Sequence, residues 1–270
     1  MKLLSSNKNP EIKRLRLLIQ KSKARKKQGL FVIEGQREIE KALKGNYKLD
    51  SLFLKEGSEE EYFEFLQENN QIAQYVVSSS LFKQISIRSG SEKSLAIAYA
   101  KTHSISELEI THEALVLVIE APEKPGNIGA LYRTAVAADF DAVIIANPKT
   151  DFYNPNSIRS SLGCLFLLPT ALASSEAAIN YLKQKEVLIA AAAPVPGAQS
   201  YDAFEYPTPC ALVVGTESTG LDQQWIEAAH QQLIIPMASA LDSLNLSVSA
   251  GILMYEARRN KIAYNQHRNL

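Results

Sequence analysis

The chain has 270 residues, of which 46% are hydrophobic and 21% charged, a composition typical of a globular protein with one or two domains. Its 29 basic and 29 acidic side chains cancel, which excludes a uniformly basic coat for nucleic acid. Two cysteines exclude a disulfide-dense scaffold and a cysteine-clustered zinc site, and no apolar run reaches the 18 residues of a membrane span.

The balanced charge hides a basic segment at residues 1–30, where ten lysines and arginines face one acid, Glu11. Five of these cations fall within residues 21–27, directly before an apolar strand. The alternatives are a solvated basic helix end and a polyanion-binding surface, and the density of charge favours phosphate binding. The predicted phosphate-binding residues are Lys13, Arg14, Lys21, Lys23, Arg25, Lys26 and Lys27. The segment lacks an apolar core followed by a cleavage site, so we expect a reduced, cytoplasmic protein.

The first hundred residues alternate between helical and extended patterns, which predicts a small α/β domain over 1–100. Asn9 and Pro10 predict the start of a helix that ends near residue 20. Further helices are expected over 36–44 and 58–69, and strands over 30–35, 48–54, 74–77 and 94–100.

A polar linker is predicted at 101–112, and a second domain follows over 113–270. Its strands are continuous apolar runs, typical of a parallel sheet covered on both faces. These strands are expected over 114–120, 142–146, 164–169, 187–192, 210–215 and 232–236. The helices between and after them are expected over 128–139, 155–161, 175–185, 222–230 and 244–260. The alternation predicts an α/β fold with a mainly parallel sheet.

Three strand ends carry unusual loops, over 120–135, 215–222 and 235–251. In open parallel sheets, ligands bind beyond the carboxyl ends of the strands, so we expect the functional site there. The loops lack the dinucleotide fingerprint, the phosphate-binding loop of nucleotide triphosphatases and the nucleophile elbow of hydrolases. The four histidines fit no metal-ligand spacing, and we expect no metal.

Together these loops resemble the SpoU (TrmH) family of S-adenosylmethionine-dependent RNA ribose 2′-O-methyltransferases, within the SPOUT superfamily. The matching residues of the first loop are Asn127, Gly129, Arg133 and Thr134. Those of the second are Gly215, Glu217 and Gly220. Those of the third are Ile235, Pro236, Met237, Ser243, Leu244, Asn245 and Ser247. The stretch 154–163 resembles the family's intermediate segment, and the first 95 residues resemble its N-terminal RNA-binding domain.

The resemblance implies a SPOUT-type sheet with a C-terminal trefoil knot, S-adenosylmethionine as cofactor without a metal, and a homodimer. It implies that the substrate is structured RNA, gripped by the basic segment, and an N-terminal domain of this kind favours ribosomal RNA. The implied cofactor-binding residues are Gly215, Gly220, Ile235, Pro236, Met237 and Leu244. Ser218 and Ser239 stand where the family usually has glycine, which bears on cofactor affinity.

The implied catalytic residues are Asn127, Arg133, Glu217, Ser243 and Asn245. A guanidinium is ordinarily a poor proton acceptor, so we expect Arg133 to hold the target phosphate and to stabilise the developing alkoxide. Participation of the arginine in deprotonation stays open. We expect Asn127 to orient the substrate or its loop, and Ser243 with Asn245 to position Arg133 and the ribose. Glu217 either pairs with Arg133 or organises its own loop.

Other functions remain as alternatives. One is the same reaction on transfer RNA, against which the N-terminal domain leans without deciding it. Another, from a different class, is an RNA-binding protein that has lost catalysis. The retained Asn127, Arg133, Glu217 and Asn245 argue against lost catalysis, while Ser218 and Ser239 argue slightly for it. A nucleotide-dependent oxidoreductase is disfavoured because the fingerprint is missing.

Overall fold

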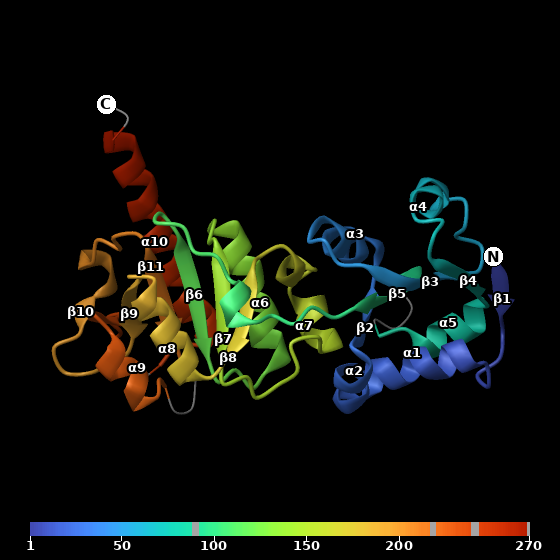
Figure 1. The fold of residues 1–270 in the computed structure, drawn as a ribbon, viewed down its shortest axis with the longest axis horizontal. Helices are drawn as coiled ribbons and strands as arrows, with labels where there is room; N and C mark the ends of the chain where they lie inside the picture. The colour runs from blue at the N-terminus through green and yellow to red at the C-terminus, as the bar shows by residue number, and fades with distance from the viewer. Residues whose placement is uncertain (88–91, 217–219, 239–242, 269–270) are drawn as a thin grey trace. The chain divides into compact units, whose positions relative to one another are not determined.

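The structure is a computed structural model that describes residues 1–87, 92–216, 220–238 and 243–268. The chain divides into two compact units, Met1–Thr102 with Asp151–Leu167, and His103–Thr150 with Leu168–Leu270 (Figure 1). The predicted boundaries differ from this division at Asp151–Leu167, which packs with the N-terminal residues. Among the described residues, none of the helices combines the length and apolar character that a membrane crossing requires.

The first unit contains a mixed five-stranded sheet in the order β1-β4-β3-β5-β2. Its strands are β1 (Lys2–Leu4), β2 (Leu30–Glu34), β3 (Leu49–Lys55), β4 (Ala73–Val77) and β5 (Ser94–Tyr99). Strand β5 runs antiparallel to both of its neighbours, whereas β4 runs parallel to β1 and β3. The helices are α1 (Pro10–Gln20), α2 (Ser22–Gln28), α3 (Gln36–Lys44), α4 (Phe63–Glu68), α5 (Ser79–Ile85) and α7 (Pro155–Ser160).

The start of α1 follows the predicted signals, because the Asn9 side chain accepts a hydrogen bond from the Glu11 amide at 2.9 Å and Pro10 is the first helical residue. Ile12, Leu15 and Leu18 share the buried face of this helix and pack into the core of the first unit. The lysine-rich segment forms a separate helix, α2, which ends where Gly29 adopts a φ of 63°.

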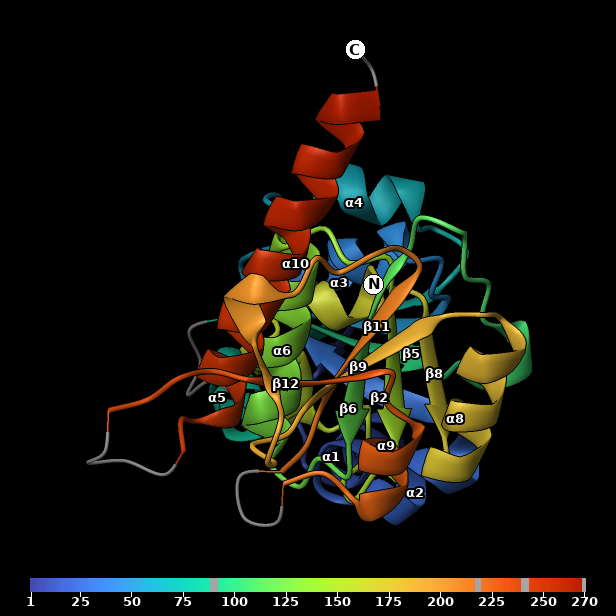
Figure 2. The same cartoon turned by 90° about the vertical axis from the view of Figure 1, so that its left-hand side faces the viewer.

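The second unit is built on a parallel sheet of seven strands in the order β10-β12-β9-β11-β6-β7-β8, which confirms the predicted mainly parallel α/β fold. Helices α8 and α9 cover one face of the sheet, and α6 and α10 lie on the other (Figure 2). The strands are β6 (Leu115–Glu120), β7 (Ala142–Ala146), β8 (Thr170–Ala173), β9 (Leu188–Ala192), β10 (Gln199–Ser200), β11 (Cys210–Val214) and β12 (Gln231–Ile234). The helices are α6 (Pro125–Ala137), α8 (Ser175–Gln184), α9 (Gln223–Ala228) and α10 (Leu246–Arg268), with single 3-10 turns at Ile105–Glu107 and Tyr201–Ala203.

The predicted strand over 164–169 is wrong. Residues Cys164–Phe166 form a 3-10 turn, and the strand β8 begins only at Thr170. Gly163 has a φ of 77° and breaks the chain direction after α7. The ring of Phe166 then packs edge-on against Tyr47 with centroids 5.0 Å apart, in the first unit. An apolar run of this length reports burial but does not distinguish a strand from a buried turn.

Part of the predicted linker over 101–112 is packed. His103 is buried, with its Nδ1 atom 3.1 Å from the Thr170 carbonyl oxygen, and Leu108 lies in the core of the second unit. The acidic helix predicted over 58–69 is shorter in the structure, where α4 spans Phe63–Glu68. The last helix is longer than predicted, because α10 continues to Arg268.

Candidate functional site

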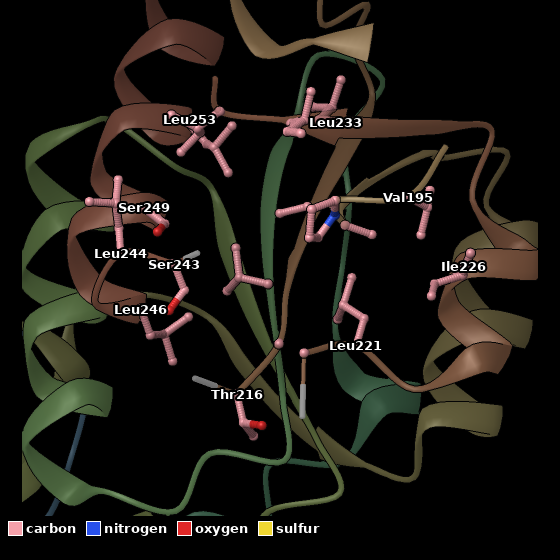
Figure 3. A pocket seen from close by; sticks show the side chains of 18 of the residues that line it. Val195, Thr216, Leu221, Ile226, Leu233, Ser243, Leu244, Leu246, Ser249 and Leu253 are labelled. Carbon is pink, nitrogen blue, oxygen red and sulfur yellow. The ribbon is translucent and has the colours of Figure 1, made fainter. Parts of the chain in front are cut away.

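A pocket of about 440 Å³ lies where β9, β11 and β12 reach their carboxyl ends (Figure 3). Ala192, Val214 and Ile234, each the last residue of its strand, contribute to its wall. Its remaining lining residues are Ala193, Pro194, Val195, Gly215, Thr216, Gly220, Leu221, Ile226, Leu233, Ile235, Met237, Ser243, Leu244, Leu246, Ser249 and Leu253. The pocket is therefore at the edge of the sheet where the loop positions predict a ligand.

The walls of this pocket are predominantly apolar. In Figure 3, Ser249 and Leu253 of α10 face the pocket from one side, and Val195 and Ile226 face it from the other. Thr216 lies at one end of the pocket. Apolar walls with a few polar groups suit a ligand with a flat aromatic part, whose polar edge is read by main-chain atoms.

Two chain segments approach each other closely at Gly215. A Cβ atom at this position would lie 2.3 Å from the Gly220 carbonyl oxygen and 2.6 Å from the Leu221 nitrogen. The amides of Thr216 and Gly220 each donate to the other residue's carbonyl, at 3.1 and 3.0 Å, and hold the segments together. Only glycine fits such an approach. Glu217 and Ser218 of the same loop lie outside the described residues.

Asn245 caps the helix that forms one wall of the pocket. Its side-chain oxygen accepts a hydrogen bond from the Ser247 amide at 3.0 Å, and its carbonyl accepts from the amides of Val248 and Ser249. Asn245 therefore fills the N-cap position of α10. Ser243 and Leu244, directly before it, line the pocket, while Ser239 lies outside the described residues.

Arg133 and Asn127 lie on α6, which packs against α10. Asn127 is half-buried in the first turn of this helix, and Arg133 is exposed further along it. Helices α6 and α10 pack side by side (Figure 2), and a Cβ atom on Gly251 of α10 would lie 3.8 Å from the Thr134 methyl group. The helix of Arg133 thus contacts the helix that forms one wall of the pocket.

The predicted site residues fall into two groups. Five of the six predicted cofactor-binding residues line the pocket, together with Ser243 of the predicted catalytic set. The predicted site residues of the second unit that the structure describes outside its lining are Pro236, Asn127, Arg133 and Asn245. No cluster of three or more histidine, cysteine or carboxylate side chains suited to a metal occurs among the described residues.

Residues 192–195, at the end of β9 and directly after it, form part of the wall and were not predicted from the sequence. The position of this segment could have indicated its role. Pro194 and Pro196 follow the end of a predicted strand, and in a parallel sheet that end lies at the same edge as the carboxyl ends of the other strands. The segment offers small and apolar side chains only, so nothing in its chemistry indicated a ligand.

Some cations of the basic segment are exposed to solvent, whereas others form ion pairs within the first unit. Lys13, Lys21, Lys23, Lys26 and Lys27 are exposed on α1, on α2 and at their junction. Arg14 instead makes a bidentate pair with Asp50, both contacts at 3.0 Å, and this hydrogen bonding raises the pKa of the guanidinium.

Arg25 was predicted to bind phosphate, but its side chain is buried. Its Nε atom donates to Asp151 at 2.6 Å, and Nη1 donates to the carbonyls of Leu18 and Ile19 at 2.7 and 3.1 Å. The guanidinium therefore connects α2 to the end of α1 and to the segment Asp151–Leu167. This structural role replaces the predicted phosphate contact, because a buried and fully engaged cation is not available to RNA.

Comparison with known protein families identifies both parts of the chain. The model of the SpoU rRNA Methylase family matches residues 114–255, and that of the MRM3-like substrate binding domain matches residues 9–96. The 23S rRNA (guanosine(2553)-2′-O)-methyltransferase RlmP of Bacillus subtilis is 30% identical over 258 residues, which cover 96% of this chain and all of that protein.

Solved structures agree with this assignment. A crystal structure of an RNA 2′-O ribose methyltransferase superposes with a TM-score of 0.83 at 37% identity, covering 96% of this chain and 99% of that one. An rRNA methyltransferase from Sinorhizobium meliloti, solved with AdoMet bound, superposes with a TM-score of 0.87 at 26% identity, covering 96% and 97% of the two chains.

Proposed function

The chain belongs to the SpoU rRNA methylase family, and from this premise we propose that the pocket beyond β11 binds S-adenosylmethionine for methyl transfer to ribosomal RNA. The protein is an RNA 2′-O-ribose methyltransferase. The observation that carries the proposal is the convergence of Gly215, Gly220, Ile235, Met237 and Leu244, from two separate loops, on one apolar pocket.

The chemistry of the pocket fits this cofactor. The close approach at Gly215 leaves no room for a Cβ atom, so main-chain groups border the pocket at the end of β11. The adenosine part of the cofactor has a flat apolar face, which Leu244, Ile235 and Leu253 can cover. No phosphate needs to be neutralised, which accounts for a wall without lysine or arginine among its lining residues.

When bound, S-adenosylmethionine supplies a methyl group on a sulfonium whose leaving group is a neutral thioether. The chain must therefore orient and activate the ribose 2′-hydroxyl. We assign to Arg133 the holding of the target phosphate and the stabilisation of charge on the 2′-oxygen. We assign to Asn127 the orientation of the substrate or of the loop before it, and to Ser243 and Asn245 the positioning of Arg133 and the ribose. For Glu217, which lies outside the described residues, we keep the two predicted roles, a pair with Arg133 or the organisation of its own loop.

We assign the first contact with RNA to the exposed lysines of α1, α2 and the residue between them. Five exposed lysines supply positive charge there, and none of them forms an ion pair within the part of the chain that the structure describes. They are Lys13, Lys21, Lys23, Lys26 and Lys27. Such contacts bind phosphates without reading sequence, and the affinity that they supply falls with salt. The MRM3-like substrate binding domain matched over 9–96 includes these helices, which supports this assignment.

We further propose that the protein acts as a homodimer through α10. Val248, Tyr255 and Ile262 recur every seven residues along this helix and are 51%, 50% and 45% exposed. An apolar stripe at heptad spacing is suited to packing against a second helix. A Tyr255→Glu variant should elute as a smaller species in size-exclusion chromatography with light scattering, whereas Lys183→Glu on α8 should not.

The trefoil knot implied by the resemblance is also a proposal, for residues 240–260. Small residues support it, since Ala250 is fully buried and a Cβ atom on Gly251 of α10 would be in ordinary van der Waals contact with the Thr134 methyl group of α6. A knotted chain would pass through a loop of its own backbone, so an experimental tracing of this segment tests the proposal.

The function is tested by three measurements on the purified chain. Calorimetric titration should show S-adenosylmethionine binding, and methyl incorporation should occur on 23S rRNA and not on transfer RNA. Arg133→Ala should abolish methylation while keeping cofactor affinity within about threefold, and Lys183→Ala, an exposed cation on α8, should retain both. Transfer of methyl groups to transfer RNA alone would favour the alternative substrate, and RNA binding without cofactor binding would favour a protein that has lost catalysis.

A further inference from the structure

A buried carboxylate ends the central strand of the second unit. Glu120 is the last residue of β6 and is 4% exposed. Its Oε2 atom accepts hydrogen bonds from the Trp225 indole Nε1 at 2.7 Å and from the Ser175 hydroxyl. Its Oε1 atom accepts from the Asn147 side-chain amide at 3.2 Å. A carboxylate in this environment requires such donors, because burial without them is costly.

The donors come from three other elements at the same sheet edge. Asn147 follows β7, Ser175 begins α8 and Trp225 lies in α9. They are also bonded to one another, since the Ser175 hydroxyl accepts from the Asn147 amide at 2.8 Å and from the Trp225 indole at 3.1 Å. The result is a closed polar network centred on Glu120. Cooperative networks of this kind hold their members in one arrangement.

The network connects the two halves of the proposed site. On one side, the chain leaves Glu120 through a short turn into α6, which carries Asn127 and Arg133. On the other side, Trp225 is adjacent to Ile226, which lines the pocket, and follows Leu221, which also lines it. The hydrogen bond from Trp225 to Glu120 therefore holds one wall of the pocket against the segment that enters α6.

We propose that Glu120 and Trp225 are positioning residues for methyl transfer, which act by holding α9 against the end of β6. The inference rests on the proposed function of the pocket. Neither residue is among the described lining of the pocket, so their effect reaches the cofactor through Leu221 and Ile226. Loss of the bond allows α9 to shift away from the sheet edge, and the wall that it supplies then fits the cofactor less well.

The principal test is Trp225→Phe, which keeps an aromatic ring in the core and removes the indole donor. We expect the Kd and KM for S-adenosylmethionine to rise about tenfold, the change that follows when the wall supplied by α9 is correctly placed in only about one molecule in ten. The KM for RNA should stay within about twofold, because the lysines on α1 and α2 are unchanged. A split between the two KM values is not expected from a general loss of stability.

A second variant, Glu120→Gln, keeps the shape of the side chain and replaces one acceptor oxygen with an amide donor. That amide faces either Asn147 or the pair Ser175 and Trp225, all of which donate to Glu120 in the native network. We expect a larger loss of cofactor affinity than in Trp225→Phe. The double variant should lose less than the sum of the single losses, because removal of the indole relieves part of the conflict.

The matched control is Tyr181→Phe on α8. This buried tyrosine donates its hydroxyl hydrogen to the Leu108 carbonyl within the same core, away from the pocket. The variant should lower Tm and leave the cofactor Kd unchanged. Equal effects of Tyr181→Phe and Trp225→Phe on the cofactor Kd, or an unchanged Kd in Trp225→Phe, would overturn the inference while the wild-type enzyme remains active. A wild-type chain that binds no S-adenosylmethionine would overturn the proposed function itself, and this inference with it.

Discussion

Replacement of Arg25 should act on folding rather than on RNA affinity. The guanidinium lies between α2, the end of α1 and Asp151, and the side chains of Arg25 and Asp151 are 5% and 9% exposed. Arg25→Met keeps much of the apolar stem and removes every one of these hydrogen bonds. Breaking a buried ion pair from one side leaves the other charge without its partner, which costs about 3–5 kcal/mol.

The loss of stability in Arg25→Met can be measured by thermal unfolding of the full chain. For a unit of this size, a loss of that order lowers Tm by roughly 10–20 °C. RNA affinity, measured well below the transition by fluorescence anisotropy with a 23S rRNA fragment, should change less than twofold. Lys26→Met is the matched control, since Lys26 is the next residue in α2 and is exposed. It should reduce RNA affinity and leave Tm nearly unchanged.

A double-variant cycle separates the pair from its surroundings. Asp151→Asn alone should also lower Tm, and Arg25→Met with Asp151→Asn should lose clearly less than the sum of the two single losses. An Arg25→Met protein that unfolds at the wild-type Tm but binds RNA as weakly as Lys26→Met would refute this reasoning. Arg25 would then be a member of the RNA-binding surface.

Three other changes are predicted. Gly215→Ala should weaken S-adenosylmethionine binding at least tenfold by calorimetry, because its Cβ would lie 2.3 Å from the Gly220 carbonyl oxygen; wild-type affinity would contradict this. Burial raises the pKa of the Cys210 thiol to about 12, so native alkylation at pH 8 should be roughly a thousandfold slower than that of an ordinary thiol. The same shift lowers the free energy of unfolding as pH rises from about 9 to 12, because the unfolded thiol ionises first, and a Cys210→Ala protein should lose this pH dependence in urea titrations. Lys23→Gln with Lys26→Gln should reduce the slope of log affinity for RNA against log salt by about 1.5–2, without changing cofactor affinity.

The proposed cofactor pocket could be predicted from the sequence because the loops that form it follow strands of one parallel sheet. Strands of one parallel sheet present their carboxyl ends at a common edge, so the loops after β11 and β12 had to meet. Gly215 and Leu244 belong to recognisable motifs, so both could be predicted as cofactor-binding residues from the sequence alone. The wall at 192–195 obeys the same rule but carries no distinctive side chain, and it was missed for that reason.

Arg25 shows that a local charge pattern does not predict which of its side chains are exposed. In the sequence it is one of five cations between residues 21 and 27, and nothing local separates it from Lys26. Its burial depends on Asp151, a residue 126 positions away. Exposure is a property of tertiary packing, so a charge run predicts a basic surface without predicting which members reach the solvent. The same limit applies to Arg14, which pairs with Asp50 across 36 positions.

The apolar run after Gly163 shows a related limit for hydrophobic patterns. Continuous apolar residues predict burial, and Cys164, Leu165 and Phe166 are indeed buried. The prediction failed because it assumed that they are buried in the sheet that their sequence neighbours form. In the structure, Asp151–Leu167 of the connection between β7 and β8 belongs to the first unit, where the Tyr153 ring stacks on Phe31 with centroids 4.0 Å apart. A hydrophobic pattern specifies that a segment needs a core, and long-range aromatic contacts then determine which core it joins.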